Sequence, residues 1–350
     1  MKYVMVLAMA GSIAACSDSN ALGPVSNSGA SGSPTSGGIP TETPAPTSGA
    51  LAGARLYVRS ASPALDQATA WRNSRAADAA LMDRIAAQPV ASWLGGWSGD
   101  VRSAVRSTVD AAAGRVPVFV VYNIPNRDCG SYSAGGEASP AAYKAWIRQV
   151  AAGVSAGSVV IVEPDAIAGM DCLSPAMQDD RLALLSDAVS VLKNAGAMVY
   201  LDAGHARWLS AGIAASRLKL AGIDKADGFS LNVSNFIQND ESVRYGDQVS
   251  SLVGGKHYVI DTSRNGNGPI SADAWCNPRG RALGRLPTTN TGNARVDAFL
   301  WVKVPGESDG SCNGGPSAGQ WWADYALELA RNQPPTFLAQ VSNRMNIFVA

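Results

Sequence analysis

The chain has 350 residues with zero formal net charge, and 46% of its residues are hydrophobic. This length is sufficient for one large α/β domain or two small ones, each with a sizeable core. Nucleic-acid binding needs a basic surface, and the Lys and Arg residues are scattered here, so the composition excludes nucleic acid as a partner.

The N-terminus has the features of an export signal. Met1-Lys2 supplies positive charge, residues 3–15 are apolar, and small residues precede Cys16. The sequence IAAC resembles a bacterial lipobox, which predicts a signal peptide over residues 1–15 and lipidation of Cys16, with the protein on the outer membrane or cell surface. Plain secretion, with Cys16 incidental, is the alternative. No later apolar run is long enough to span a bilayer, so any membrane contact is through this anchor.

A change of composition marks the start of the folded domain. Residues 17–50 are mostly Ser, Gly, Pro, Thr and Ala, and such a segment buries too little apolar surface to offset its ordering entropy. We therefore expect a linker over residues 16–50 and a catalytic domain over residues 51–350. The segment ARLYVRS, from Ala54 onward, is the first expected strand.

From there, short β-rich runs alternate with amphipathic helical stretches. Helices are expected at 141–152, 180–194 and 320–331. Strands are expected at 56–58, 90–94, 118–123, 158–163, 198–203, 228–233, 257–261 and 298–302. This alternation indicates an α/β fold with a parallel sheet, and about eight repeats favour a TIM-barrel-like arrangement over an open sheet.

Polar residues cluster where the expected strands end. These clusters are residues 123–128, 163–165, 202–205, 232–235, 261–265 and 303–309. In parallel barrels the carboxyl ends of the strands converge on one face, where active sites lie. The sequence therefore predicts a polar cleft on that face, and the nine Trp residues offer flat surfaces suited to stacking on sugars.

Four further cysteines, Cys129, Cys172, Cys276 and Cys312, remain in a chain predicted to be exported. An even number in such a chain predicts two disulfides, and the spacing leaves all three pairings open. A zinc site is the competing interpretation. It is disfavoured because the chain has no CxxC pair and only two His residues, so we expect no metal.

Carboxylates are the catalysts that the sequence leaves available. There is no GxSxG nucleophile motif, and WLGGW at 93–97 lacks the spacing of a phosphate loop. No cofactor is therefore expected. Paired carboxylates in a Trp-bearing cleft fit glycoside hydrolysis, in which one acid protonates the leaving oxygen and a second carboxylate acts on water or on the sugar.

Several motifs together resemble glycoside hydrolase family 6, the endoglucanases and cellobiohydrolases that cleave β-1,4-glucan with inversion. They occur in order from about Leu56 to the C-terminus: VVYNIPNRDCG with YSAGG, VVIVEPDAIAGM, VYLDAGHARWL, GFSLNVSNF, WCNPRGRALG and DAFLWVKVPGESDGSC. The resemblance implies a distorted barrel of about seven parallel strands, so one of the eight expected strands falls outside it. The chain departs from the family at Val304-Pro305, a position without chemistry.

The resemblance also implies roles for the carboxylates. Asp165 matches the general acid, and Asp128 matches the neighbour that raises the pKa of the acid. Asp309 matches the candidate base, with relay of the proton through water as the alternative. Asp202 matches a supporting carboxylate of the cleft, although an Asp after a strand is often a structural cap. Tyr122 matches the residue under the distorted sugar.

Further roles follow from the same resemblance. The implied disulfides are Cys129–Cys172 and Cys276–Cys312. Substrate contacts are implied for Trp93, His205, Trp208, Asn232, Trp275, Lys303 and Glu307. From the residues themselves, Arg127 is expected to be an ion-pair partner in the Asp128 loop, His257 a strand-start residue of no special role, and Trp301, Trp321 and Trp322 core residues.

Short segments between the paired cysteines and a domain of about 300 residues leave little chain to roof the cleft. We therefore expect an endo-β-1,4-glucanase, acting as a monomer on β-1,4-glucan or cello-oligosaccharides. A cellobiohydrolase is the alternative. A glucan-binding surface lipoprotein without activity is a weaker rival, because it would not need Asp128, Asp165 and Asp309.

Overall fold

The computed structural model describes residues 49–271 and 273–334, which fall within one compact unit, Pro44–Ala350. The expected signal peptide, Cys16 and nearly all of the expected linker lie outside these residues. No helix among the described residues is long and apolar enough to cross a membrane.

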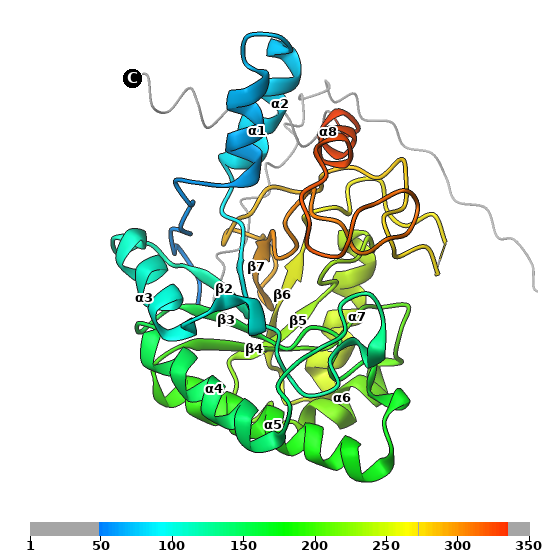
Figure 1. Ribbon diagram of the computed structural model, residues 1–350. Coiled ribbons are helices and arrows are strands. Elements are labelled where there is room, and N and C mark those ends of the chain that lie inside the picture. Colours follow the sequence, from blue (N-terminus) through cyan, green and yellow to red (C-terminus); the bar gives the residue numbers. More distant parts are fainter. Residues whose placement is uncertain (1–48, 272, 335–350) are drawn as a thin grey trace, which may run out of the picture. The chain divides into compact units, whose positions relative to one another are not determined.

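Seven strands form one sheet in the order of the chain, and all neighbours are parallel (Figure 1). They are β1 (Ser92–Leu94), β2 (Val118–Val121), β3 (Val159–Val162), β4 (Met198–Asp202), β5 (Gly228–Leu231), β6 (His257–Asp261) and β7 (Val296–Leu300). Between the β1 and β7 ends of the sheet, one isolated bridge joins Val90 to Trp301. The sheet therefore curls into a distorted barrel, as predicted, without a full β1–β7 pairing.

The expected strand at 56–58 is wrong. Leu56 makes a single bridge, to Val116, and its neighbours join no ladder among the described residues. The strand-favouring residues of this segment reflect packing instead, since Leu56 packs against the apolar cluster inside the barrel.

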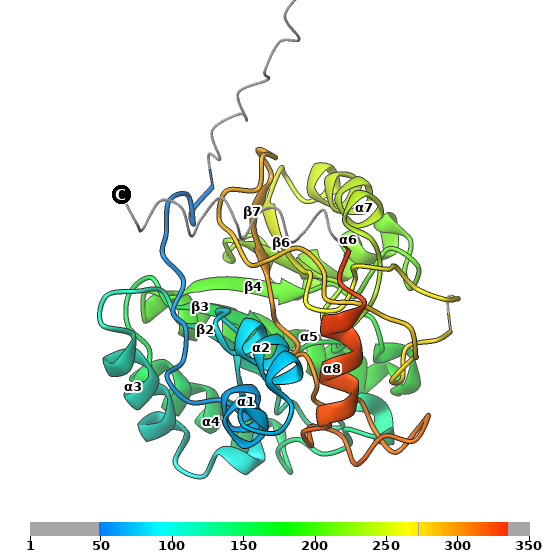
Figure 2. The same cartoon turned by 90° about the horizontal axis from the view of Figure 1, so that it is seen from above.

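In the described residues eight α-helices accompany the strands: α1 (Pro63–Trp71), α2 (Ala76–Ala86), α3 (Val101–Ala112), α4 (Pro140–Gly153), α5 (Pro175–Asn194), α6 (Ala211–Leu220), α7 (Asn239–Leu252) and α8 (Ala323–Arg331). Three of them begin at a Ser-Pro pair, where the Ser62, Ser139 or Ser174 hydroxyl accepts a backbone N–H and the proline occupies the first turn. Helices α3 to α7 follow one another around the sheet, and α1, α2 and α8 form a separate group (Figures 1 and 2).

Alternation along the strands divides the core. In β2, Val118 and Val120 point into the barrel, and the interior cluster also contains Leu51. Phe119 and Val121 point outward to the cluster beneath the helices. Because the strands are buried on both faces, their polar side chains are concentrated at the carboxyl ends.

A third apolar cluster joins the helical group to the sheet. Trp301 is buried against α1, α2 and α8, and Trp321 and Trp322 pack against the same cluster. The core assignment is confirmed for Trp301, whereas Trp321 and Trp322 are half-buried at the edge of this cluster. His257 starts β6 as expected, and its Nδ1 lies 2.8 Å from Asp297 Oδ1.

Candidate active site

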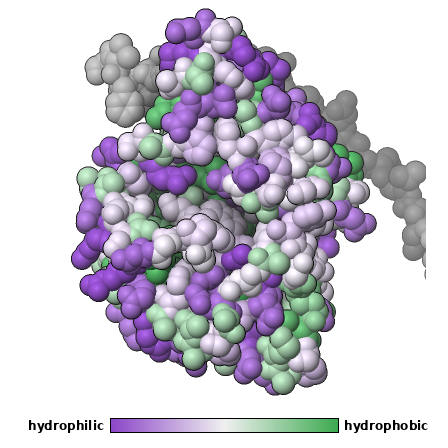
Figure 3. Space-filling view, viewed as in Figure 1, coloured by the Kyte–Doolittle hydropathy of each residue, from purple (hydrophilic) through white to green (hydrophobic). Residues whose placement is uncertain are grey.

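A cleft of about 1270 Å³ opens at the carboxyl ends of the strands, and Figure 3 shows the hollow on the surface. Side chains from all seven strands or the loops after them line it. Ten of the predicted site residues are among them: Trp93, Tyr122, Asp128, Asp165, His205, Trp208, Trp275, Lys303, Glu307 and Asp309. Two others, Asp202 and Asn232, are not.

Sharp turns after β2 and β3 hold the two central carboxylates. Asp128 and Asp165 have φ angles of 56° and 67°, and Glu163 has a φ of 50°. This left-handed region is unfavourable for residues with a side chain, at a cost of about 1–3 kcal/mol each, and such residues cluster at functional sites. The disulfide Cys129–Cys172 links the two turns, with a Cα–Cα distance of 6.1 Å.

Cys276–Cys312 similarly brackets the loop that carries Asp309. Both pairings implied by the family resemblance are confirmed.

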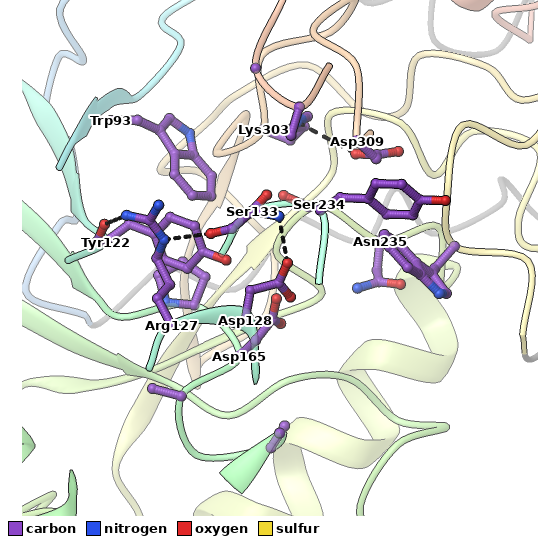
Figure 4. A pocket seen from close by; sticks show the side chains of 18 of the residues that line it. Trp93, Tyr122, Arg127, Asp128, Ser133, Asp165, Ser234, Asn235, Lys303 and Asp309 are labelled. Carbon is purple, nitrogen blue, oxygen red and sulfur yellow. Dashed lines mark hydrogen bonds and ion pairs between the residues drawn. The ribbon is translucent and has the colours of Figure 1, made fainter. Parts of the chain in front are cut away.

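Asp165 lies in surroundings that disfavour its ionised form. Burial raises its pKa well above the ordinary value, and the negative charges of Asp202, Asp128 and Asp309 raise it further. Figure 4 shows the Asp128 and Asp165 carboxyl groups in the same part of the cleft. Asp128 therefore raises the pKa of Asp165 as predicted, but its effect is smaller than that of burial and smaller than that of Asp202. A carboxyl group in such surroundings keeps its proton to higher pH than an exposed one and is able to donate it.

Asp128 is fixed by its own loop. The backbone N–H of Ser133 donates to its Oδ2 at 2.6 Å, and burial raises the pKa of Asp128. Within the described part of the chain Arg127 forms no ion pair; the guanidinium donates instead to the backbone carbonyls of Tyr122, Ser133 and Ala134. The expectation of an ion pair at Arg127 is therefore wrong, although the residue does hold this loop.

Asp309 lies in the opposite electrostatic environment. Arg264, which is buried, donates to its Oδ2 at 2.9 Å, and Lys303 Nζ lies 3.4 Å from its Oδ1 (Figure 4). The backbone N–H of Asn277 adds a third contact at 3.0 Å. Burial acts to raise the pKa of Asp309, but the two cations and the hydrogen bonds outweigh it and bring the pKa below the ordinary value. The surroundings therefore favour the ionised form of Asp309 and the protonated form of Asp165.

Asp202 and Asn232 are fully buried structural residues. Asp202 accepts the backbone N–H groups of Asp165 and Gly204, both at 3.0 Å, and burial raises its pKa to about 7. Asn232 bonds the carbonyl of Asp261 at 2.8 Å and the N–H of Ile237 at 2.9 Å. The direct sugar contact expected of Asn232 is wrong, because its amide is used up inside the loop. Asp202 supports the backbone of Asp165 and does not line the cleft.

Three residues without an assigned role hold the site together. Glu163 accepts the backbone N–H groups of Asn123 and Ile124 and so joins the β2 and β3 turns; its pKa is raised to about 7 by burial. Asp261 accepts those of Ser234 and Lys303, and Arg264 pairs with Asp309. Glu163, Asp261 and Arg264 all lie in the polar clusters at the strand ends. These clusters identified the face of the barrel that carries the cleft, but they did not show what each of the three residues does.

Aromatic rings line the cleft beside the carboxylates. Trp93 packs edge-on to Tyr122 with centroids 5.3 Å apart, and its Nε1 donates to the carbonyl of Val302 at 2.8 Å. Trp208 and Trp275 are 42% and 43% exposed, so each keeps a free face. Burial lowers the pKa of His205, beside Trp208, to about 4, which makes it a neutral imidazole. Exposed indoles next to neutral hydrogen-bonding groups suit a sugar.

A family model supplies the decisive comparison: the model of glycosyl hydrolases family 6 matches residues 51–333. The chain belongs to glycosyl hydrolases family 6. It is therefore a glycoside hydrolase, as its motifs predict.

Three relatives show where the chain lies within family 6. Endoglucanase A of Cellulomonas fimi is 48% identical over 83% of this chain, which spans 62% of that protein's length. The structure of the endoglucanase Cel6 from Mycobacterium tuberculosis, in complex with methyl-cellobiosyl-4-deoxy-4-thio-β-D-cellobioside, is 47% identical with a TM-score of 0.75, covering 81% of this chain and 98% of the other. A probable 1,4-β-D-glucan cellobiohydrolase C of Aspergillus terreus is 31% identical over 65% of this chain and 62% of its own length.

Proposed function

We propose that this family 6 member is an inverting endo-β-1,4-glucanase that hydrolyses internal bonds of cellulose or soluble β-glucan, with Asp165 as the general acid. The observation that carries the proposal is the opposite titration of two carboxyl groups in one cleft. The pKa of Asp165 is raised and that of Asp309 is lowered. Pairs of carboxyl groups whose pKa values are pushed apart supply the acid and the base of glycoside hydrolysis.

In this proposal Asp165 gives its proton to the oxygen of the leaving sugar as the glycosidic bond breaks. A water molecule attacks the anomeric carbon from the opposite face and loses a proton toward Asp309 or through further water. Asp128 keeps Asp165 protonated before the reaction, and its carboxylate stabilises positive charge on the sugar ring in the transition state. Tyr122, packed against Trp93, supports the ring at the scissile bond.

The remaining cleft residues fit sugar subsites. Trp93, Trp208 and Trp275 offer stacking faces, and neutral His205 offers a hydrogen bond to a hydroxyl. Its Nδ1 accepts the backbone N–H of Arg207 at 3.3 Å, which leaves Nε2–H for the substrate. We assign Lys303 and Glu307 to sugar hydroxyls on the β7 side of the cleft.

Internal cleavage is favoured by the relatives and by the loops. The relatives at 48% and 47% identity are named endoglucanases, whereas the cellobiohydrolase is at 31%. The loop-closing disulfides span 43 and 36 residues, which is short for segments that would enclose a tunnel. A cellobiohydrolase is the second candidate on the strength of that third relative.

We further propose that the protein is exported. Two disulfides are typical of proteins that fold in an oxidising compartment, and Cys16 in IAAC is the proposed site of lipidation. We expect the domain to act as a monomer.

Viscosity and reducing ends, measured together on carboxymethyl cellulose for the wild type and Asp165→Ala, test the proposal. We expect a steep loss of viscosity per new end in the wild type and almost none in the variant. Slow viscosity loss with release of cellobiose would indicate the cellobiohydrolase. Glucan binding without new ends would indicate the binding protein, and full activity of Asp165→Ala would overturn the acid assignment.

The stereochemistry has a separate test. Proton NMR of the first products from a cello-oligosaccharide should show the α-anomer before mutarotation if the bond is cleaved with inversion. An initial β-anomer would mean retention and would make one of the carboxylates a nucleophile.

A further inference from the structure

One aromatic ring crosses the mouth of the cleft. Tyr132 follows β2, but its ring lies against residues that follow β6 and β7. The ring centroids of Tyr132 and Trp275 are 6.1 Å apart with planes inclined by 56°. The Tyr132 ring also covers Gly310 so closely that a methyl group at position 310 would lie 2.4 Å from it. Because the β1 and β7 ends of the sheet meet at the Val90–Trp301 bridge, only β1 lies between β2 and β7 on that side of the barrel. The contact therefore joins the loops on either side of β1.

The ring divides the residues proposed to bind sugars. Trp93 belongs to β1, on one side of the line from β2 to β7, and Lys303 and Glu307 precede Gly310 in the loop after β7. His205 and Trp208, after β4, lie on the other side. A glucan bound on both sides therefore passes the ring, and all of these residues line the same cleft as Tyr132 and Trp275.

The backbone on both sides of the contact is anchored. Next to Tyr132, Cys129 is held by its disulfide and the Ser133 carbonyl accepts Arg127 Nε at 2.7 Å. On the other side, the Gly310 carbonyl accepts the Asn277 side-chain amide and the Cys312 N–H, both at 2.8 Å. These anchors leave the side chain of Tyr132 as the part that is free to move.

The Tyr132 side chain itself is weakly held. It is 50% exposed, and its hydroxyl makes no hydrogen bond to any residue that the structure describes. The contact with Trp275 is one between two rings, and rotation about the side-chain bonds of Tyr132 breaks it without moving a loop. Tyr132 Cβ stays beside Gly310. Exposed side chains make such rotations in picoseconds to nanoseconds.

We propose that Tyr132 is a specificity-determining residue, a swinging bar that an internal segment of glucan must displace to enter the cleft from the side. A chain end passes beneath the ring, whereas the middle of a long polymer has no end to insert. The Tyr132–Trp275 contact therefore sets the balance between internal and end-directed cleavage. The inference rests on the proposed glucanase activity and names what limits access to that same site.

Three variants distinguish the contribution of the Tyr132 ring from that of its hydroxyl and from that of its contact with Gly310. Tyr132→Ala removes the ring, and Tyr132→Phe keeps the ring as the matched control. Gly310→Ala places a methyl group against Cγ and Cβ of Tyr132 and so displaces the side chain. Folding of each is checked by thermal unfolding, and the half-exposed position 132 makes loss of the fold in Tyr132→Ala unexpected. The readouts are kcat/KM on carboxymethyl cellulose and on cellohexaose.

We expect the polymer-to-cellohexaose ratio of kcat/KM to rise by about two- to tenfold in Tyr132→Ala, as loss of one aromatic contact allows. Gly310→Ala should move the same way and Tyr132→Phe should stay at the wild-type ratio. An unchanged ratio in Tyr132→Ala would overturn the proposed role of Tyr132. This includes an equal fall of kcat/KM on both substrates, which is the result expected if Tyr132 were a fixed stacking surface for sugar. The proposed glucanase activity would stand in that case, because the wild type is active. A wild type that is inactive on both substrates would instead contradict the proposed function and, with it, the proposed role of Tyr132.

Discussion

Asp202 Oδ1 accepts the backbone N–H of Asp165 at 3.0 Å. The same carboxyl group therefore supports the turn that carries Asp165 and, once it ionises with its pKa of about 7, is a source of negative potential beside it. Because Asp202 is fully buried, little solvent screens that potential. Its charge is a larger influence on the pKa of Asp165 than that of Asp128, which shares the cleft with the acid.

Replacing Asp202 by Asn should lower the pKa of the acid. The amide keeps an oxygen to accept the Asp165 N–H but removes the negative charge that disfavours ionisation of Asp165. With a lower pKa, Asp165 loses its proton at lower pH, so the alkaline limb of kcat/KM should move down by about one unit. Asp261→Asn is the control, because Asp261 is buried in the same way but influences Asp165 only through its effect on the pKa of Asp202. Equal shifts in both variants would contradict this account.

Replacing Arg264 by Gln should act on the other limb. The guanidinium stabilises the ionised form of Asp309, so its removal raises the pKa of Asp309 and the acidic limb of kcat/KM should move to higher pH. Arg264→Lys, which keeps a positive charge, should move it less. Thermal unfolding must accompany the assay, because breaking a buried ion pair typically costs about 3–5 kcal/mol of stability. An acidic limb that stays in place would mean that Asp309 does not accept the proton.

Asn232→Ala and Trp208→Ala should separate stability from binding. Asn232 is buried and bonded inside its loop, so its loss should lower the free energy of unfolding by about 1–3 kcal/mol and leave KM for cello-oligosaccharides nearly unchanged. Trp208 has a free face in the cleft, so its loss should raise KM by about tenfold with little effect on stability. Denaturant unfolding and steady-state kinetics on both variants check this. A large KM change in Asn232→Ala with normal stability would restore the sugar contact.

Removing the Cys129–Cys172 disulfide should affect both stability and rate. A crosslink that spans 43 residues restricts the unfolded chain by an amount worth about 4 kcal/mol, so the Cys129→Ser, Cys172→Ser double variant should unfold at a lower temperature. Its kcat should also be lower than that of the wild type at temperatures well below the melting temperature, because the left-handed turns at Asp128 and Asp165 lose their crosslink. Treatment of this variant with a reducing agent isolates the remaining bond. A kcat equal to that of the wild type would show that the turns need no crosslink.

Several features were determined by local sequence. Ser-Pro pairs set the starts of α1, α4 and α5 because capping and a fixed φ are local properties. Apolar runs between polar clusters placed β2 to β6 within one or two residues. The carboxylates at the strand ends identified the catalytic face, since parallel strands bring their carboxyl ends together whatever the details of the loops.

Tertiary structure alone decided how those carboxylates behave. Sequence cannot distinguish Asp165 from Asp309 by environment, because the pKa of each depends on groups distant in the chain: Asp202 for the first, Arg264 for the second. It also cannot show that the Asn232 amide is used up inside its loop, or that Arg127 bonds carbonyls and makes no ion pair. Burial and electrostatic potential are sums over neighbours in space, and only the folded chain defines those neighbours.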